Sequence, residues 1–148
     1  MAKGNFDVKD LIAPLMLRIP LGLIFMAHGS QKLLGLFGGQ GLTATFKTFE
    51  EKMGIPPIFT LLAIIAEFAG GFGVLTGFLT RLSAAGISTV MLVAIYKINW
   101  VNGFFLNLTG VVGRGHGIEY NTALLGMALY LVLAGGGRWC LDRLVFKG

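Results

Sequence analysis

Charged residues are scarce in this chain. Asp, Glu, Lys and Arg make up 13% of its 148 residues, which is about half the share in an average soluble domain. Apolar residues make up 55%, and the mean hydropathy is +0.77. This balance excludes an ordinary soluble domain and predicts an integral membrane protein. The 23 glycines agree with that class, because glycine lets transmembrane helices approach closely.

Cysteine and histidine are also scarce. A single cysteine, Cys140, excludes an internal disulfide and a CxxC redox motif. Two distant histidines beside one cysteine do not have the spacing of a structural zinc site. No Ser/His/Asp or Cys/His arrangement suggests nucleophilic catalysis. We therefore predict no metal site and no covalently bound cofactor in this chain.

Basic residues never cluster, although the net charge is +5. They stand singly near the ends of apolar runs, which indicates membrane topology rather than nucleic-acid binding. The first run starts near Leu11 and is interrupted by Pro14, Arg18 and Pro20. No clear A-x-A cleavage site follows it, so we interpret it as a retained span rather than a signal peptide.

Four apolar runs are long enough to cross a bilayer as helices. They cover residues 11–34, 58–80, 82–100 and 118–134 of a single domain, 1–148. Thr80-Arg81 is predicted as a short turn between the second and third spans, and 101–117 as a glycine-rich loop. Residues 42–53 repeat apolar positions every three or four residues, which predicts a short amphipathic helix at the membrane interface. The predicted fold is all-α, an integral membrane four-helix bundle.

The first span carries a polar stripe. On a helix, Arg18, Gly22, Phe25, Gly29 and Lys32 fall within roughly 40° of one another. His28 lies at the edge of that stripe, and Gln31 ends it together with Lys32. Such a stripe is costly against lipid, so it is expected to face the inside of the bundle.

Glu67 lies near the middle of the second span, and it is the sharpest single signal in the sequence. A carboxylate at that depth needs a partner, a proton or water. If the first two spans pack antiparallel, Glu67 falls within a turn or two of His28 and Lys32. Two readings stay open: a proton-handling carboxylate in a cavity, or an ion pair that holds two helices together.

The remaining polar residues have two readings each. His28 is a candidate general acid or base, a quinone hydrogen-bond partner or, together with His116, a haem ligand, although a core histidine is more often simply hydrogen-bonded. Arg18 either extends to the headgroups or meets an anion inside the bundle. Glu119 and Tyr120 open the fourth span, where helix capping and an interfacial aromatic are the plain interpretations.

The residues in these spans, taken in order, resemble the DoxX/DoxD family over nearly the whole chain. The motifs that carry the resemblance are Arg18-x3-Gly22, His28-Gly29-x-Gln31-Lys32-Leu33, Ala66-Glu67-x2-Gly70-Gly71, Gly77-x2-Thr80-Arg81, Gly117-x-Glu119-Tyr120, and Gly135-x-Gly137 followed by Leu141-Asp142. Gly136 departs from the usual Gly-Pro-Gly of the last motif.

The resemblance implies a four-helix membrane protein of the bacterial or archaeal cytoplasmic (inner) membrane, with quinone as substrate or cofactor. Relatives include the membrane subunit of thiosulfate:quinone oxidoreductase and membrane partners of redox proteins. We therefore predict a redox-complex subunit. The even number of spans and a slight excess of Lys and Arg on the side of the termini predict that both termini are cytoplasmic, and the cavity is expected to open to the other side. Glu67 and His28 are the predicted catalytic residues. The predicted substrate-binding residues, for a quinone or a small sulfur anion, are Arg18, Gln31, Lys32, Glu119 and Tyr120.

Two other functions fit the same residues. A non-enzymatic anchor or assembly subunit for a soluble or membrane redox partner would explain why the chain lacks a complete catalytic set. A small-solute or proton carrier with only four spans would need to form a homo-oligomer.

Overall fold

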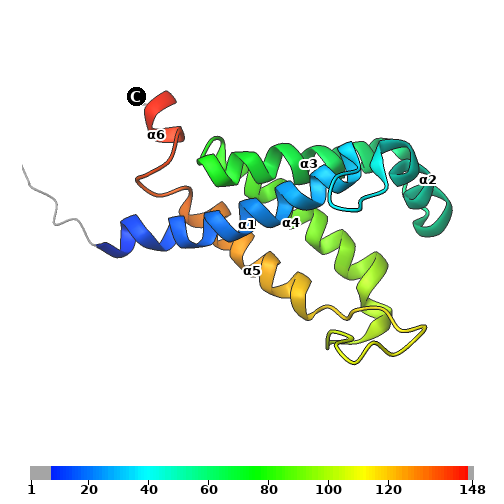
Figure 1. The fold of residues 1–148 in the computed structure, drawn as a ribbon. Helices are drawn as coiled ribbons and strands as arrows, with labels where there is room; N and C mark the ends of the chain where they lie inside the picture. The colour runs from blue at the N-terminus through cyan, green and yellow to red at the C-terminus, as the bar shows by residue number, and fades with distance from the viewer. Residues whose placement is uncertain (1–7, 147–148) are drawn as a thin grey trace, which may run out of the picture.

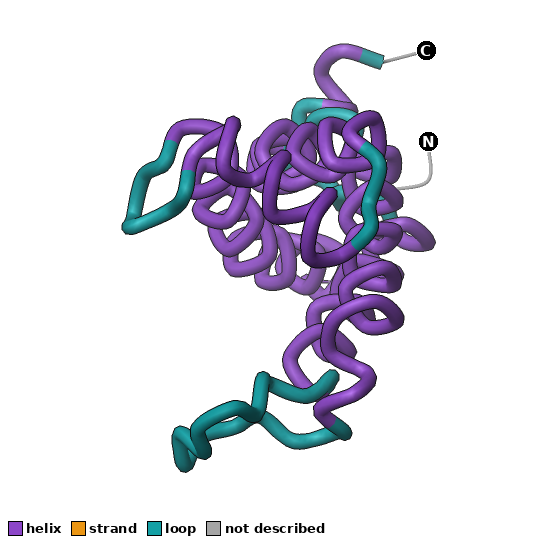
Figure 2. The backbone as a smooth tube through the Cα atoms, turned by 90° about the vertical axis from the view of Figure 1, so that its right-hand side faces the viewer, coloured by secondary structure: helices purple, strands orange, loops and turns teal. Residues whose placement is uncertain are grey.

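The computed structural model describes residues 8–146 of the chain. Its main helices are α1 (Val8–Leu34), α2 (Gly41–Met53), α3 (Pro57–Thr76), α4 (Thr80–Ala94) and α5 (Glu119–Ala134). Two short helices, η1 (Ile95–Asn99) and η2 (Trp100–Asn102), extend α4, and α6 (Asp142–Val145) lies near the C-terminus. No strand occurs among the described residues, and Figure 2 shows helices joined by loops only. The all-α prediction is confirmed.

The helices form two pairs. In Figure 1, α3 runs alongside α1, whereas α4 and α5 diverge from them toward the long loop at residues 103–118. The core joins both pairs near the end where they meet. It consists of Leu21, Phe25, Val74, Ala84, Ile87, Met91, Leu124, Ala128 and Leu131. The molecule is therefore closed at one end of the bundle and open at the other.

Three helical segments are long and apolar enough to cross a membrane: Ile12–Leu34, Pro57–Thr76 and Thr80–Asn102. The fourth apolar helix, α5, has 16 residues, which corresponds to about 24 Å at 1.5 Å per residue. Many large apolar side chains on these helices are exposed, as expected where lipid replaces water. The chain is a helical membrane bundle that sits in a lipid bilayer.

Glycine brings α1 and α3 into close contact. A Cβ atom on Gly29 would lie 2.5 Å from the backbone nitrogen of Phe68, and one on Gly71 would lie 2.6 Å from that of Met26. A Cβ atom on Gly22 would lie 2.9 Å from the backbone oxygen of Gly71, which is also too close. These positions therefore require glycine, and the close approach places Lys32 beside α3.

The turn between the second and third spans differs from the prediction. Thr80 and Arg81 are already helical, and the turn lies at residues 77–79. Gly77 closes α3 in the left-handed conformation, and Leu79 also has a positive φ of 47°. Helix α4 starts earlier than predicted because Asp142 caps its first turn. The residues around Thr80 give no sign of this cap, since Asp142 is distant in the sequence.

Candidate functional site

Lys32 and Glu67 form an ion pair between α1 and α3. The Lys32 ammonium contacts both carboxylate oxygens, with Nζ to Oε2 at 2.6 Å. Glu67 is 3% exposed, whereas the Lys32 side chain is 26% exposed. The pairing that the sequence raised as one alternative is confirmed. A carboxylate at this depth is tolerated because the ammonium neutralises it.

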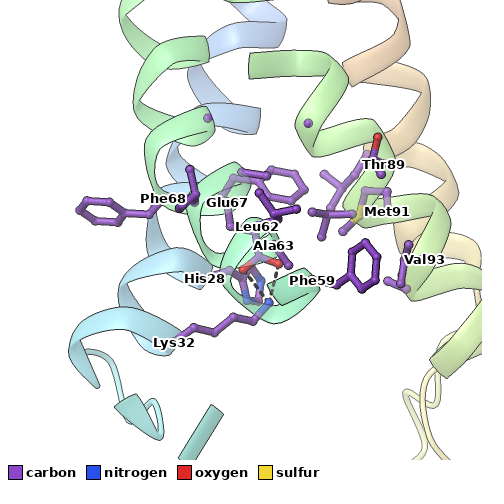
Figure 3. Close-up of a pocket in the computed structure, with 18 of the residues that line it drawn as sticks. His28, Lys32, Phe59, Leu62, Ala63, Glu67, Phe68, Thr89, Met91 and Val93 are labelled. Carbon is purple, nitrogen blue, oxygen red and sulfur yellow. Dashed lines mark hydrogen bonds and ion pairs between the residues drawn. The ribbon is translucent and has the colours of Figure 1, made fainter. Parts of the chain in front are cut away.

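Two further side chains surround the ammonium of Lys32. The ring of Phe49, on α2, lies under it with its centroid 5.3 Å from Nζ, which is a cation–π geometry. His28 lies one turn before Lys32 on α1, and Figure 3 shows its imidazole beside the ion pair. The His28 side chain is exposed and makes no hydrogen bond to residues 8–146. Its ring nitrogens are thus free to bind a ligand.

These residues line one end of a large cavity. The cavity has a volume of about 1660 Å³ and lies between the α1–α3 and α4–α5 pairs. Its walls are mostly apolar, with Phe59 and Leu62 on α3 facing Met91 and Val93 on α4 (Figure 3). The ion pair and His28 are therefore a polar patch on a mainly hydrophobic surface, whose lining also includes Lys97 and Asn99 of η1.

The opposite wall carries the predicted residue Tyr120 and also His116. Both line the cavity. The imidazole Nδ1 of His116 accepts a hydrogen bond from the backbone N–H of Asn107 at 3.2 Å, and its carbonyl oxygen accepts one from the Asn99 side chain at 2.8 Å. In the neutral ring the hydrogen therefore sits on Nε2. His116 belongs to a loop that is held in place, although its glycine content suggested flexibility.

Arg18 lies away from this cavity, although the sequence predicted it there. It precedes Lys32 by 14 residues, or about 21 Å along the helix, and it is 2% exposed. Its guanidinium donates to four backbone oxygens: Val74 at 2.8 Å, Leu75 at 2.9 Å, Gly136 at 2.9 Å and Trp139 at 2.6 Å. Arg18 therefore contacts neither headgroups nor a carboxylate. It fastens the end of α3 and the 135–140 segment to α1.

Gln31 and Glu119 also lie outside the cavity lining. The Gln31 amide donates to the carbonyl oxygen of Phe37 at 3.2 Å, within the turn that follows α1. The Glu119 carboxylate accepts from the backbone N–H of Leu106 at 3.2 Å and so holds the 103–118 loop. The structure thus brings together His28, Lys32, Glu67 and Tyr120 around the cavity, and separates them from the other predicted residues.

Sequence reasoning missed the roles of two residues, Phe49 and Asp142. The predicted amphipathic helix contained Phe49 but gave no sign that the ring would lie against Lys32. Asp142 appeared only as part of the C-terminal motif. Its Oδ2 accepts from the backbone N–H of Thr80 at 2.9 Å and from the Thr80 hydroxyl at 2.8 Å, and its Oδ1 accepts from the Leu79 N–H. The only sign of this contact in the sequence was that Thr80 and Asp142 both belong to the family motifs.

The fold and the site define a small helical membrane protein whose spans enclose a Lys–Glu ion pair beside an apolar cavity. A family model described as DoxX matches residues 13–100 of the chain. The chain belongs to the DoxX family, as its motifs predicted.

Three relatives match over most of their length. "Inner membrane protein YqjF" of Escherichia coli (strain K12) is 32% identical over 95% of both chains. "Uncharacterized membrane protein Rv3486" of Mycobacterium tuberculosis is 32% identical over 88% of this chain and 80% of its own. "Putative oxidoreductase CatD" of Bacillus subtilis (strain 168) is 28% identical over 93% of this chain and 90% of its own. No solved structure matches the chain significantly.

Proposed function

We propose that this chain is the quinone-binding membrane subunit of a redox complex in the bacterial or archaeal cytoplasmic membrane, with both termini in the cytoplasm. The observation that carries the proposal is the Lys32–Glu67 pair, which is placed on the wall of a large apolar cavity. The name of the relative in Bacillus subtilis, which includes the word oxidoreductase, supports a redox role, and that of the relative in Escherichia coli supports the membrane location.

The shape of the cavity suits an amphiphile with a small polar head and a long apolar chain. The polar groups of α1 and α3 stand at one wall, and the apolar side chains of α3 and α4 continue along both helices to Phe78 and Leu82. A quinone head would contact Lys32 and His28, and its isoprenoid chain would lie between Phe59, Phe72 and Val93. Such mostly apolar pockets with few polar groups are typical of small-molecule sites.

Charge balance favours a neutral head over the small sulfur anion that the sequence left open. Both oxygens of Glu67 are already bound by Lys32, so the pair has no net charge. An anion at the Lys32–Glu67 pair would lose its hydration without gaining an unpaired cation there. Lys97, on η1, is the other lysine in the cavity lining. A lysine ammonium has three N–H donors, so one remains after two contacts to Glu67. A quinone carbonyl oxygen can accept from that donor.

Reduction of a quinone to a quinol consumes two electrons and two protons, and this requirement suggests a role for each residue, with Glu67 positioning Lys32 rather than acting as a catalytic residue as the sequence predicted. The electrons come from a redox partner protein, since the described residues include no redox-active set. Lys32 orients the carbonyl oxygen, and Glu67 holds Lys32 in place. His28, which is exposed and makes no hydrogen bond to residues 8–146, transfers the two protons to the head one after the other and takes a new proton from water between them. Tyr120 contributes a hydroxyl donor from the other wall.

A binding titration of the purified chain with a short-chain quinone, in lipid nanodiscs, tests the proposal. The matched variants are Lys32→Met, at the site, and Lys47→Met, which removes an exposed lysine from α2. Loss of one charge-assisted hydrogen bond is expected to weaken binding by at least tenfold in Lys32→Met. The Lys47→Met variant should bind as the unaltered chain does. Equal affinity in both variants would refute the assignment of the head to Lys32.

An anchor or assembly role is the second candidate, and the loop at residues 103–118 favours it. This loop is held by side-chain hydrogen bonds from Asn102 and Asn107. It nevertheless exposes Phe105 at 68%, Leu108 at 85% and Val112 at 98%. An ordered, apolar and exposed loop is suited to a protein partner. Replacing these three residues with alanine would then abolish co-purification of a partner while leaving quinone binding unchanged.

A further inference from the structure

A second cavity lies at the end of the bundle that carries Arg18. It has a volume of about 460 Å³. The start of α4 contributes Thr80 and Arg81, the segment after α5 contributes Gly135–Gly137, and α6 contributes Arg143. None of these residues belongs to the quinone cavity. The two cavities share Leu79 and Leu82 at their edges, but no charged residue lines both, so the charged groups of the second cavity are independent of the proposed function.

The charge around this cavity is positive and accessible. Its one carboxylate, Asp142, has its oxygens engaged by the backbone N–H groups of Leu79 and Thr80 and by the Thr80 hydroxyl. Arg81 uses one donor, on the Leu133 carbonyl oxygen at 3.1 Å. Arg143 is exposed and makes no hydrogen bond or ion pair to residues 8–146. Two guanidinium groups thus keep donors for an anion while the nearby carboxylate is occupied.

Apolar residues line the same cavity. Leu79 is 40% exposed, Leu82 is 68% exposed and Phe146 is 58% exposed, and the Phe146 ring stacks on Phe78 with centroids 6.4 Å apart. The cavity therefore offers arginine donors and a hydrophobic wall side by side. A free phosphate ion would use only the first of these, whereas a phospholipid uses both.

From this arrangement we infer that the Arg81–Arg143 cavity binds the phosphate of an anionic phospholipid, whose acyl chain lies against Leu82 and Phe146. Arginine binds phosphate oxygens through paired N–H donors, and basic pockets between helices at a membrane surface bind anionic headgroups. The cavity lies at the same end of the bundle as the capped start of α4. Lipid bound there bridges α4 to the C-terminal segment.

The test is a lipid titration of the full chain in mild detergent, followed by native mass spectrometry and by thermal unfolding. Phosphatidylglycerol is the probe, phosphatidylcholine is the zwitterionic comparison and inorganic phosphate is the free-ion comparison. Arg143→Gln is the principal variant, because Arg143 has no structural bond within residues 8–146. Arg81→Gln is the second variant. Arg114→Gln removes an exposed arginine from the 103–118 loop, away from this cavity, and is the matched control.

The inference predicts saturable binding of phosphatidylglycerol, with stabilisation that phosphatidylcholine does not reproduce. Arg143→Gln is expected to weaken that binding about fivefold, and Arg114→Gln to leave it unchanged. If Arg143→Gln and Arg114→Gln weaken phosphatidylglycerol binding equally, the effect comes from the overall charge of the protein, and the proposed site is wrong. Equal stabilisation by inorganic phosphate would overturn the lipid assignment.

Discussion

Asp142 caps a helix that begins 62 residues earlier in the chain. Its carboxylate accepts from the Thr80 backbone N–H at 2.9 Å and from the Thr80 hydroxyl at 2.8 Å. Thr80 is fully buried, so its hydroxyl has no water to replace this partner. The start of α4 is thereby fixed by the last described turn of the chain.

Asp142→Ala is expected to lower the free energy of unfolding by about 1–3 kcal/mol, because it removes a helix cap and leaves a buried hydroxyl unpaired. Asp142→Asn keeps an acceptor oxygen and should lose less. Thermal unfolding in detergent, followed by circular dichroism, measures both variants. A melting temperature of Asp142→Ala equal to that of the unaltered chain would contradict the capping role.

Removing one member of the Lys32–Glu67 pair is expected to cost more than removing both charges. Lys32→Met leaves the carboxylate of Glu67 buried without its cation, at a cost of about 3–5 kcal/mol. The double variant Lys32→Met, Glu67→Gln has no buried charge and should recover much of that loss. A double-mutant cycle in unfolding free energy provides the measurement. Strictly additive losses would show that the two side chains do not stabilise one another.

Arg18→Lys is expected to be strongly destabilising although it keeps the positive charge. A lysine ammonium is a compact donor on a flexible stem and does not reproduce the planar guanidinium. The four carbonyl oxygens around Arg18 would lose at least one hydrogen bond, because lysine has only three N–H donors, and each lost bond costs about 1.5–3 kcal/mol. Arg114→Lys, at an exposed loop position, should change stability by less than about 0.5 kcal/mol. Equal melting temperatures for the two variants would contradict the fastening role.

Gly29→Ala is expected to separate α1 from α3. Its Cβ would meet the backbone of Phe68 at 2.5–2.6 Å, and backbone atoms in a packed helix have little room to move. Overpacking of this kind costs about 1–3 kcal/mol. Gly126→Ala is the matched control, because a Cβ there meets no atom of another packed segment within 4 Å, and it should stabilise α5 by about 0.5–1 kcal/mol. A stabilising Gly29→Ala would contradict the close packing of α1 and α3.

The helices and the central ion pair were predictable from sequence because the alternatives cost much free energy: apolar runs would be exposed to water, and a carboxylate would be buried without a cation. Long apolar runs specify spans, and a carboxylate at the depth of Glu67 needs a cation from a neighbouring span. Lys32 was the nearest cation at that depth if the first two spans ran antiparallel. The ion pair, which the sequence left open beside a proton-handling carboxylate, follows from these two facts.

The position of Arg18 was not predictable in the same way. Its partners are backbone oxygens at Val74, Leu75, Gly136 and Trp139, and every residue has such an oxygen. No residue pattern therefore marks them. The start of α4 was misplaced for a related reason, since Asp142 acts across a long sequence separation. Contacts to the backbone and caps from distant segments are invisible to periodicity.

The full set of hydrogen bonds of Arg18 can form only late in the synthesis and membrane insertion of the chain. Two of its four oxygen partners, Gly136 and Trp139, are synthesised more than 110 residues after it. During insertion the first helix therefore carries a charged guanidinium whose partners have not yet left the ribosome. Translation has to reach the final segment before this charge is satisfied. A chain cut short before residue 136 should then be recognised as unfinished and degraded, even though all four apolar helices have been made.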